Sequence, residues 1–347
     1  MDLKNKLSSL LLAMLLCSSV LAESTEGNYD MRKDYGAKFE PIGNRILHGA
    51  GQDAAAFANY IEASGKKPSV SIQYVSPHHD YRSFVLDYRK ELESYHGAYI
   101  IPQLGMHMNR DEDPEHTYYE RIALGKMDTV LERYLTAIAS LNRPIFLRIG
   151  FEFNGEWNGY TRPDVYVQAF QHTVDMIREL GFDNIAIVWC YNPDGQAKDF
   201  MSYYPGDEYV DWWAIDVFDI NSISTPHAED FLLQADIHNK PIMLSECTPY
   251  TYYVQQDEAW SGWFVPFFNY IHTHPGIKCV CYINWKWTDY PQWQNWGDAR
   301  LEKAAASLLK AYQEEINHPI WLHAFTEDEA ADLIYGISTG ITKEMEK

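Results

Sequence analysis

Short apolar runs of strand length alternate along this chain with longer stretches that have the periodicity of amphipathic helices. This alternation is typical of parallel βα units, in which each strand is buried on both faces and followed by a covering helix. We predict strands at residues 44–49, 69–75, 98–105, 143–152, 184–189, 210–218, 241–246 and 277–285. We predict helices at residues 53–63, 81–95, 119–140, 163–180, 226–239, 257–272 and 299–315, and only a short one near 198–203.

Eight strand-plus-connection units without an intervening linker predict an α/β protein with a single (β/α)8 TIM barrel and a short C-terminal extension. An open doubly wound sheet would need a glycine-rich phosphate turn, and we find none in the sequence. We place the barrel at residues 44–316, between an N-terminal extension at 23–43 and a C-terminal extension at 317–347. Residues 324–337 of that extension are a candidate helix.

The first 22 residues have the pattern of a signal peptide. Lys4 and Lys6 precede an apolar run at residues 10–16, and Ala22 completes an acceptable cleavage site. The run is too short to span a bilayer, so we expect an exported protein, secreted or periplasmic, with no membrane span. Lipid attachment at Cys17 is the alternative, but the leucines directly before that cysteine disfavour it.

Charge and composition limit the classes of molecule that the protein is expected to bind. The formal net charge of −21 would repel nucleic acid and anionic surfaces, and it favours a neutral substrate. Aromatic residues make up 15% of the chain, with 11 Trp and 25 Tyr. Such rings suit either an aromatic core or a cleft that stacks on the apolar faces of sugars.

The remaining cysteines could form disulfides in an oxidising compartment, although buried free thiols are the simpler interpretation. They are Cys190, Cys247, Cys279 and Cys281. The sequence contains no Cys-x-x-Cys pair and no helical His-Glu-x-x-His run, so we expect no metal and no cofactor.

Charged residues interrupt the fourth predicted strand. With a strand period of two, Phe146, Arg148, Gly150 and Glu152 share one face, while the opposite face, which ends in Phe151, is entirely apolar and should meet the helices. Arg148 and Glu152 should then point into the barrel mouth, because the carboxyl ends of the strands build the active site in this fold.

A second carboxylate, Glu246, ends the seventh strand in the same way, 94 residues after Glu152. That separation corresponds to three βα units, so the two strand ends should lie roughly opposite each other around the ring. Two inward carboxylates suit the general acid and the nucleophile of glycoside hydrolysis.

These residues also resemble a known family. The run from Arg148 to Trp157, Arg-Ile-Gly-Phe-Glu-Phe-Asn-Gly-Glu-Trp, resembles the fourth-strand motif Arg-x-x-His-Glu-Met-Asn-Gly-x-Trp of glycoside hydrolase family 26. Pro-Ile-Met-Leu-Ser-Glu at 241–246 is similar to the seventh-strand segment of that family. Ser-Glu-Cys-Thr-Pro at 245–249 and Tyr-Ile-Asn-Trp-Lys-Trp at 282–287 resemble its β-1,3-xylanase branch more than its β-1,4-mannanase branch.

The resemblance, which covers roughly residues 44–312, implies a retaining endo-β-glycanase that cleaves a neutral polysaccharide with a β-1,3-xylan-type or β-mannan-type backbone. It implies that Glu152 is the acid/base and Glu246 the nucleophile, with their carboxyl groups about 5 to 5.5 Å apart. One departure concerns the substrate: Phe151 stands where the mannanases carry His.

Six further residues are candidates for substrate binding, each with a structural alternative: Arg148, Asn154, Trp157, Tyr191, Asp216 and Trp285. Arg148 could orient a carboxylate or form a structural ion pair, and Asp216 could bind substrate or be a buried hydrogen-bonded carboxyl. Trp285 is the expected aromatic platform beneath a bound sugar. For Trp287, Trp293 and Trp296, packing within the loop is an equally good interpretation, and Asn192 is a weaker candidate beside Tyr191.

Two other classes remain open. A metal-dependent barrel hydrolase could use the histidines and aspartate near the first three strand ends, which are His48, His78, His79, Asp80 and His107. A non-catalytic sugar-binding barrel is the other possibility, although binding alone does not require two carboxylates. The expected partner is a polysaccharide or oligosaccharide, with no nucleic acid, and we expect a monomer.

Overall fold

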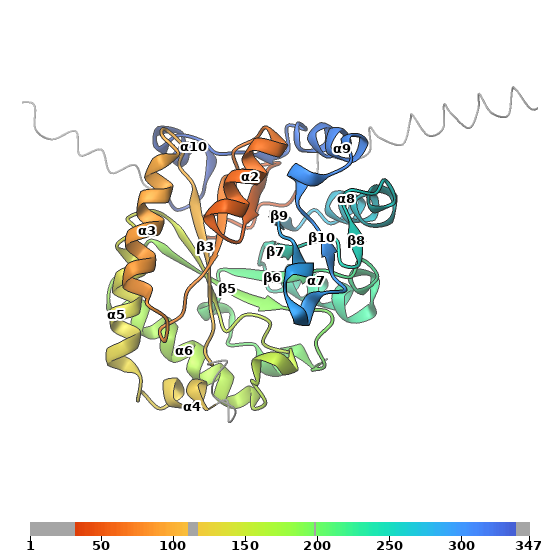
Figure 1. The fold of residues 1–347 in the computed structure, drawn as a ribbon. Coiled ribbons are helices and arrows are strands. Elements are labelled where there is room, and N and C mark those ends of the chain that lie inside the picture. The colour runs from red at the N-terminus through yellow and green to blue at the C-terminus, as the bar shows by residue number, and fades with distance from the viewer. Residues whose placement is uncertain (1–31, 110–116, 198, 338–347) are drawn as a thin grey trace, which may run out of the picture. The chain divides into compact units, whose positions relative to one another are not determined.

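A computed structural model describes residues 32–109, 117–197 and 199–337. Within these residues the strands form one closed parallel barrel, in which each strand pairs with the next and β9 returns to β1 (Figure 1). The barrel strands are β1 Ile46–Gly51, β2 Val70–Tyr74, β3 Ile101–Met106, β4 Ile145–Ile149, β5 Ile185–Tyr191, β6 Trp212–Val217, β7 Ile242–Cys247 and β9 Ile277–Ile283. The predicted eight-stranded TIM barrel is confirmed.

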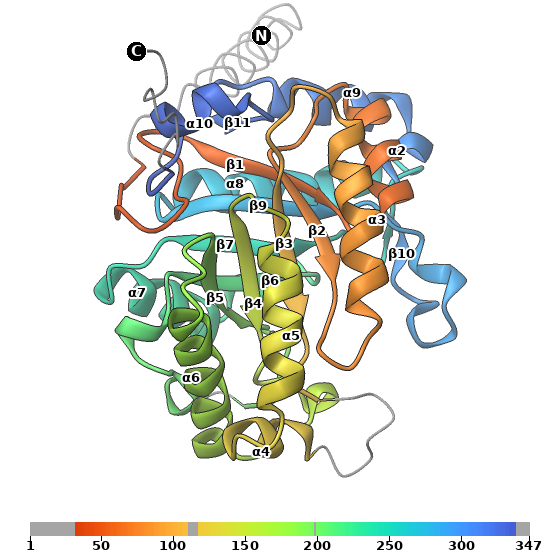
Figure 2. The ribbon, with the colours of Figure 1, turned by 90° about the vertical axis from the view of Figure 1, so that its left-hand side faces the viewer.

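Helices cover the outer face of the barrel, and Figure 2 shows α3, α5 and α6 along the outside of β2, β3 and β4. The helices of the described residues are α2 Ala54–Ser64, α3 Tyr81–Ser94, α4 Tyr118–Ala123, α5 Asp128–Ala139, α6 Pro163–Glu179, α7 Pro226–Ile237, α8 Val265–Thr273, α9 Ala306–Ile316 and α10 Glu327–Leu333. Local sequence sets their ends. The side chain of Asp53 caps α2 by accepting from Ala56 N, and Gly65 stops that helix at a φ of 71°.

Three predicted helices differ from the structure. The helix expected at 119–140 is broken into α4 and α5 around Gly125, whose φ is 68°. The helix expected at 299–315 begins only at Ala306, and the one at 257–272 starts with a wider turn at Trp260–Phe264 before α8. Among its described residues, the connection after β5 contains only short 3-10 turns, at Phe200–Tyr203 and Asp207–Tyr209.

A small second sheet joins two loops at the carboxyl ends of the barrel strands. In it β8, Tyr252–Tyr253, pairs with β10, Gly297–Asp298. Gly297 has a φ of 96°, and a Cβ there would lie 2.0 Å from the carbonyl oxygen of Tyr252. Only glycine permits this approach, which anchors the end of the long loop after β9.

The opposite end of the barrel is closed by both terminal segments. The Phe39 ring packs edge-on against Phe146 inside the barrel, and Trp212 Nε1 donates to the carbonyl of Lys38. β11, Trp321–Leu322, pairs with β1, and Phe39 N donates to the carbonyl of Tyr335. The C-terminal extension therefore packs on the barrel through residue 337, and the candidate helix at 324–337 is confirmed only over α10.

The signal peptide predicted at residues 1–22, with Cys17, lies outside the described residues, as do 23–31 of the N-terminal extension and 338–347 of the tail. Among the residues that the structure describes, no helix is long and apolar enough to cross a membrane. As expected, the four remaining cysteines are buried free thiols: Cys190, Cys247, Cys279 and Cys281.

Candidate active site

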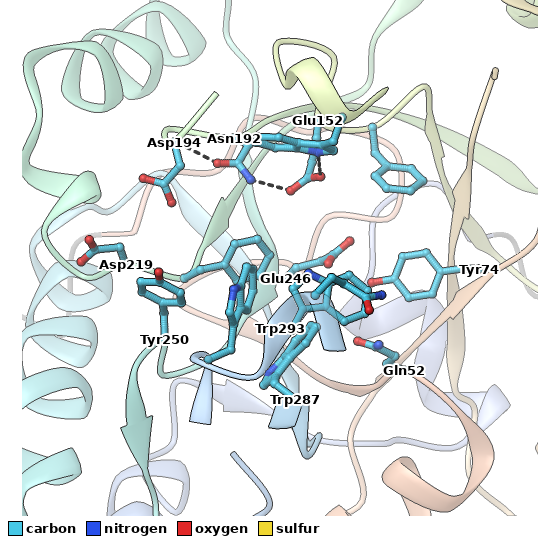
Figure 3. A pocket seen from close by; sticks show the side chains of 15 residues that line it. Gln52, Tyr74, Glu152, Asn192, Asp194, Asp219, Glu246, Tyr250, Trp287 and Trp293 are labelled. Atoms are coloured by element: carbon cyan, nitrogen blue, oxygen red, sulfur yellow. Dashed lines mark hydrogen bonds between the residues drawn. The ribbon is translucent and has the colours of Figure 1, made fainter. Parts of the chain in front are cut away.

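A cavity of about 910 Å³ opens at the carboxyl ends of the barrel strands (Figure 3). Its polar lining includes four carboxylates, from Glu152, Asp194, Asp219 and Glu246. Aromatic rings provide much of the remaining wall: Tyr74, Phe151, Trp157, Phe218, Tyr250, Trp287, Trp293 and Trp296. Among the described residues no Lys, Arg or His lines this cavity, so its wall combines negative charge with apolar ring faces.

Glu152 reaches the cavity on irregular backbone rather than on a strand. β4 ends at Ile149, and Gly150 and Glu152 follow with φ values of 54° and 48°. A glutamate in this left-handed region is strained, and surrounding contacts must hold it there. Asn158 Nδ2 provides them by donating to the carbonyls of Phe151 and Glu152 over 2.8 and 3.1 Å.

Because of this turn, the side-chain direction predicted for Phe151 is wrong. Phe151 was expected to face the helices, but it lines the cavity, with its ring centroid 5.8 Å from that of Tyr74. The cause is that alternation of side chains applies only within the strand, and the positive φ of Gly150 reorients the residues after it.

The carboxyl group of Glu152 is buried and accepts two hydrogen bonds. Asn192 Nδ2 donates to Oε1 over 2.5 Å, and Trp157 Nε1 donates to Oε2 over 2.6 Å. Burial raises the pKa of Glu152 to about 7, the charge of Glu246 adds to the rise, and both hydrogen bonds oppose it. The group is therefore divided between its protonated and ionised forms near neutral pH.

Glu246, on β7, has a cation as its partner. Arg148 Nη2 donates to Glu246 Oε1 over 2.6 Å from a side chain that is fully buried beneath the cavity. Tyr74 also hydrogen bonds to Glu246, and burial raises the pKa of this phenol well above its usual range, so it stays protonated. Two donors thus hold the carboxyl group of Glu246 in one orientation.

A second buried carboxyl group supports the arginine. Asp216 Oδ2 lies 3.6 Å from Arg148 Nη1, while Ser245 Oγ donates to Asp216 Oδ1 over 2.5 Å. Burial raises the pKa of Asp216 well above its usual range, and the charge of Glu246 raises it further. Arg148 therefore contacts both carboxyl groups, and its shorter contact is the one with Glu246.

Asn154 connects the loop after β4 to the end of β5. Its Nδ2 donates to the carbonyl of Asn192 over 2.6 Å, and its Oδ1 accepts from Asn192 N over 2.9 Å. A Cβ on Gly195 would lie 2.3 Å from Asn154 Nδ2, so glycine is needed for this close approach. The paired contacts fix the backbone of Asn192 and aim its side chain at Glu152.

The comparisons with known proteins point to one family. The family model for glycosyl hydrolase family 26 matches residues 93–264. This chain belongs to that family. It is accordingly a glycoside hydrolase, in a family whose members retain the anomeric configuration.

Among curated family 26 relatives, a β-1,3-xylanase from a Vibrio species is 27% identical over 332 residues, which cover 85% of this chain and 69% of the relative. A β-1,3-xylanase from an Alcaligenes species is 26% identical over 235 residues, covering 59% of this chain and 49% of that protein. A mannan endo-1,4-β-mannosidase from Bacillus subtilis is 24% identical over 163 residues, covering 38% of this chain and 45% of the relative.

Solved structures support the fold of this family 26 chain. A family 26 β-mannanase from Bacteroides ovatus superposes with a TM-score of 0.62 at 14% identity, covering 80% of this chain and 90% of that one. A family 26 protein from a Muricauda species gives a TM-score of 0.61 at 14% identity, with 83% and 88% covered.

The structure brings only some of the predicted site residues of this family 26 chain to the cavity. Glu152, Glu246 and Trp157 line it. Arg148 and Asp216 lie fully buried beneath it, and Asn154 lies behind Asn192. Tyr191 stacks on Phe231 of α7 with ring centroids 4.7 Å apart, so its ring belongs to the packing between β5 and α7. None of these four residues is on the cavity wall.

The tryptophan predicted as the sugar platform and the tryptophans that line the cavity are different residues. Trp285 was the predicted platform but is not on the cavity wall, whereas Trp287, Trp293 and Trp296 are. Trp287 Nε1 donates to Thr248 Oγ1 over 2.9 Å, and its ring centroid lies 4.8 Å from that of Trp296. These rings pack in the loop and also line the cavity, so both interpretations considered for them apply.

Sequence reasoning missed several wall residues. Tyr74, at the end of β2, could have been found from its place at a strand end, the same signal that identified Glu246. Gln52, Asp194, Asp219, Tyr250 and Gln292 lie in loops, where no periodicity indicates which way a side chain points.

The histidines considered as metal ligands have other partners. His48 contacts His323 and Tyr60 at the closed end of the barrel. His107 Nε2 contacts Asn158 Oδ1 over 2.8 Å and so helps orient the residue that holds the turn at Glu152. Within the described residues, no group of three or more His, Cys, Asp or Glu side chains is placed to bind a metal ion.

Proposed function

We propose that this chain is a retaining endo-β-glycanase that hydrolyses a neutral β-linked polysaccharide by double displacement, with Glu152 as acid/base and Glu246 as nucleophile. One observation carries the assignment: two carboxyl groups line the same cavity in opposite electrostatic environments. Burial raises the pKa of Glu152 to about 7, while Glu246 is paired with the Arg148 cation. Two carboxyl groups in such different environments can act as acid and nucleophile at the same pH.

In the first step, Glu246 attacks the anomeric carbon while Glu152 gives its proton to the departing glycosidic oxygen. The bond from carbon to the leaving oxygen breaks as the bond from carbon to the Glu246 carboxylate forms, with inversion at that carbon. In the second step Glu152, now ionised, takes a proton from water, whose oxygen attacks the same carbon and releases Glu246. The second inversion restores the original configuration.

The lining favours a neutral glycan. A cavity wall with four carboxylates and no described basic residue would repel uronic acid or sulfate groups, whereas indole faces pack well on pyranose rings. The Vibrio and Alcaligenes relatives are β-1,3-xylanases, and the Bacillus subtilis relative is a mannanase. A β-1,3-xylan-type backbone is our first choice and a β-mannan-type backbone the second. We further propose that the protein is exported by the N-terminal signal segment, to be secreted or periplasmic.

A panel of β-1,3-xylan, β-1,4-mannan and mixed-linkage glucan, with products separated by length, tests the substrate. Oligosaccharides of several lengths from one neutral glycan are the expected result, and single sugars only would contradict endo action. Glu152→Gln and Glu246→Gln should each lower kcat by at least about 100-fold. Near-normal turnover in either variant would refute the assignment of the two carboxylates.

Small anions distinguish the two roles. In Glu152→Ala, azide should restore turnover of an activated aryl glycoside and give a glycosyl azide of unchanged configuration, because the glycosyl enzyme still forms on Glu246. In Glu246→Ala, any azide product should have inverted configuration. The reverse pattern would exchange the two assignments.

A further inference from the structure

Trp157 combines two properties that are uncommon in one side chain. It is 48% exposed, yet its indole N–H is bonded to the buried carboxyl group of Glu152 over 2.6 Å. It also lines the cavity. A large apolar surface thus lies open to a ligand while the polar atom of the same ring is joined to the residue proposed as acid/base.

Gly155 provides the seat for this indole. A Cβ at Gly155 would lie 2.3 Å from Cε2 and 2.5 Å from Cζ2 of Trp157, so the ring lies directly on the glycine backbone. The φ and ψ of Gly155 are −82° and 133°, a conformation open to any residue. Glycine is therefore required here for space, and the space is what lets the indole reach Glu152.

The two oxygens of Glu152 receive different kinds of donor. Asn192, which donates to Oε1, is buried, and its backbone N–H donates to the side chain of Asn154. Trp157, on Oε2, comes from a short turn at Glu156–Asn158 on the side open to the cavity. Of the two donors, only Trp157 has a large exposed surface that a bound sugar can cover.

We propose that Trp157 couples binding of the leaving-group sugar to proton transfer by Glu152. The inference rests on the proposed function, because it takes Glu152 as the acid/base. An acid that protonates a glycosidic oxygen must lie beside the bond being cleaved, so the sugar on the leaving side is next to Glu152 and within reach of the exposed indole face. Stacking of that sugar fixes the ring and keeps its N–H on Oε2.

The coupling serves both chemical steps. In the first step the stacked ring positions the leaving sugar and the oxygen that receives the proton. Once that sugar has left, the N–H donates to an ionised carboxylate, a charge-assisted bond that favours the form of Glu152 needed as base for water. Trp157 is thus a binding residue for one sugar and a positioning residue for the acid/base.

The test compares two substrates that have the same type of glycone sugar but different leaving groups. The first is a β-1,3-xylo-oligosaccharide, which needs protonation of a sugar leaving group, and the second is a β-xylobioside of dinitrophenol, whose leaving group needs no proton. For Trp157→Phe we expect kcat/KM to fall at least about 10-fold on the oligosaccharide and less than about 3-fold on the aryl glycoside. The alkaline limb of the oligosaccharide pH profile should move upward, because a bond that lowers the pKa of Glu152 is removed.

Gly155→Ala provides an independent variant, because it keeps the tryptophan but displaces its ring. Like Trp157→Phe, it should lower kcat/KM more on the oligosaccharide than on the aryl glycoside, and it should move the alkaline limb of the pH profile to higher pH. Trp260→Phe, in the wide turn before α8, removes a tryptophan that is not on the cavity wall and should leave both readouts unchanged. Equal losses on the two substrates without a change in the pH profile would overturn the coupling. Full activity of Glu152→Gln would overturn the proposed function, and the coupling with it.

Discussion

Arg148 Nη2 lies 2.6 Å from Glu246 Oε1, and neither the guanidinium nor its partner Asp216 is exposed to solvent. The ring of Phe151 covers the guanidinium at 4.9 Å from its centroid. The cation that orients the proposed nucleophile is therefore enclosed by protein, and it acts on the substrate through Glu246.

Replacing Arg148 by Met should both destabilise and inactivate the protein. It leaves Asp216 and Glu246 buried without their cation, and breaking a buried pair in this way costs about 3 to 5 kcal/mol. Urea unfolding and kcat on the preferred glycan measure the two effects. Arg148→Lys keeps the charge, so it should recover part of the stability while kcat stays low, because an ammonium cannot reproduce the orientation of the guanidinium. Wild-type kcat/KM in Arg148→Met would contradict the positioning role.

Activity should fall as pH rises through about 7, because Glu152 must carry a proton to act as acid and burial raises its pKa to about 7. The measurement is kcat/KM against pH with an oligosaccharide substrate, since this parameter reports the free enzyme. A profile that stays flat to pH 9 would be inconsistent with Glu152 as the acid.

The same raised pKa predicts a cost in stability. Glu152 in the unfolded chain ionises near 4.5, so the folded form loses relative stability as pH rises from 4.5 to about 7. Glu152→Gln removes this ionisation and should raise the free energy of unfolding relative to wild type at pH 8 but not at pH 4. Denaturant unfolding at the two pH values checks the sign, and an equal change at both would exclude the linkage.

The aromatic wall predicts different effects for two neighbouring tryptophans. Trp293 lines the cavity and packs edge-on against Trp287, whereas Trp285 is not on the wall. Trp293→Ala should raise KM for a long oligosaccharide about 2- to 13-fold, which corresponds to the loss of about 0.5 to 1.5 kcal/mol from one aromatic stacking contact. Trp285→Ala should change KM less, and the opposite ranking would restore Trp285 as the platform.

The turn that delivers Glu152 should tolerate no side chain at Gly150. Its φ is 54°, and a Cβ there would lie 2.5 Å from Met108 Cε and 2.9 Å from Tyr166 Cε2. Gly150→Ala should cost about 2 to 4 kcal/mol from left-handed strain and overpacking together, and it should lower kcat by moving Glu152. Gly181→Ala is the matched control, because its φ is 70° but its Cβ would meet nothing within 4 Å. Similar losses in both variants would mean that strain alone decides the effect.

A histidine pair at the closed end of the barrel should make the fold sensitive to acid. His323 Nε2 must donate to the carbonyl of Ile316, which leaves its Nδ1 to accept from His48 Nδ1 over 2.8 Å. His48 Nε2 then accepts from the Tyr60 hydroxyl, so neither ring has room for another proton. Burial lowers the pKa of His323 to about 4, and Lys66 adds to the shift.

Stability should therefore decline as pH falls from about 6.5 toward 4, because the unfolded chain takes up protons that the folded pair refuses. His323→Gln can make both hydrogen bonds without titrating, so its Tm should decrease less between pH 7 and pH 5 than that of wild type. Parallel Tm curves for the two proteins would rule out the pair as the source of acid sensitivity.

The amino-acid sequence alone determined the barrel and one half of the site. Alternating apolar and amphipathic segments predict eight βα units, because a parallel strand must be buried on both faces. Glu246 could be placed at a strand end from the same pattern, although β7 shifts register between Leu244 and Cys247, so strict side-chain alternation does not hold there. Tyr74 could have been found in the same way.

Only the tertiary structure decided how the other half is built. Past Ile149 the backbone turns left-handed at Gly150 and Glu152, so parity no longer predicts where Phe151 points. The reach of Trp157 to Glu152 depends on contacts within an irregular loop, and the reversed roles of Trp285 and Trp293 depend on a loop anchored by the pairing of β8 with β10. Loops have no repeat that relates position in the chain to direction in space, so their side chains are placed by long-range contacts that the sequence does not display.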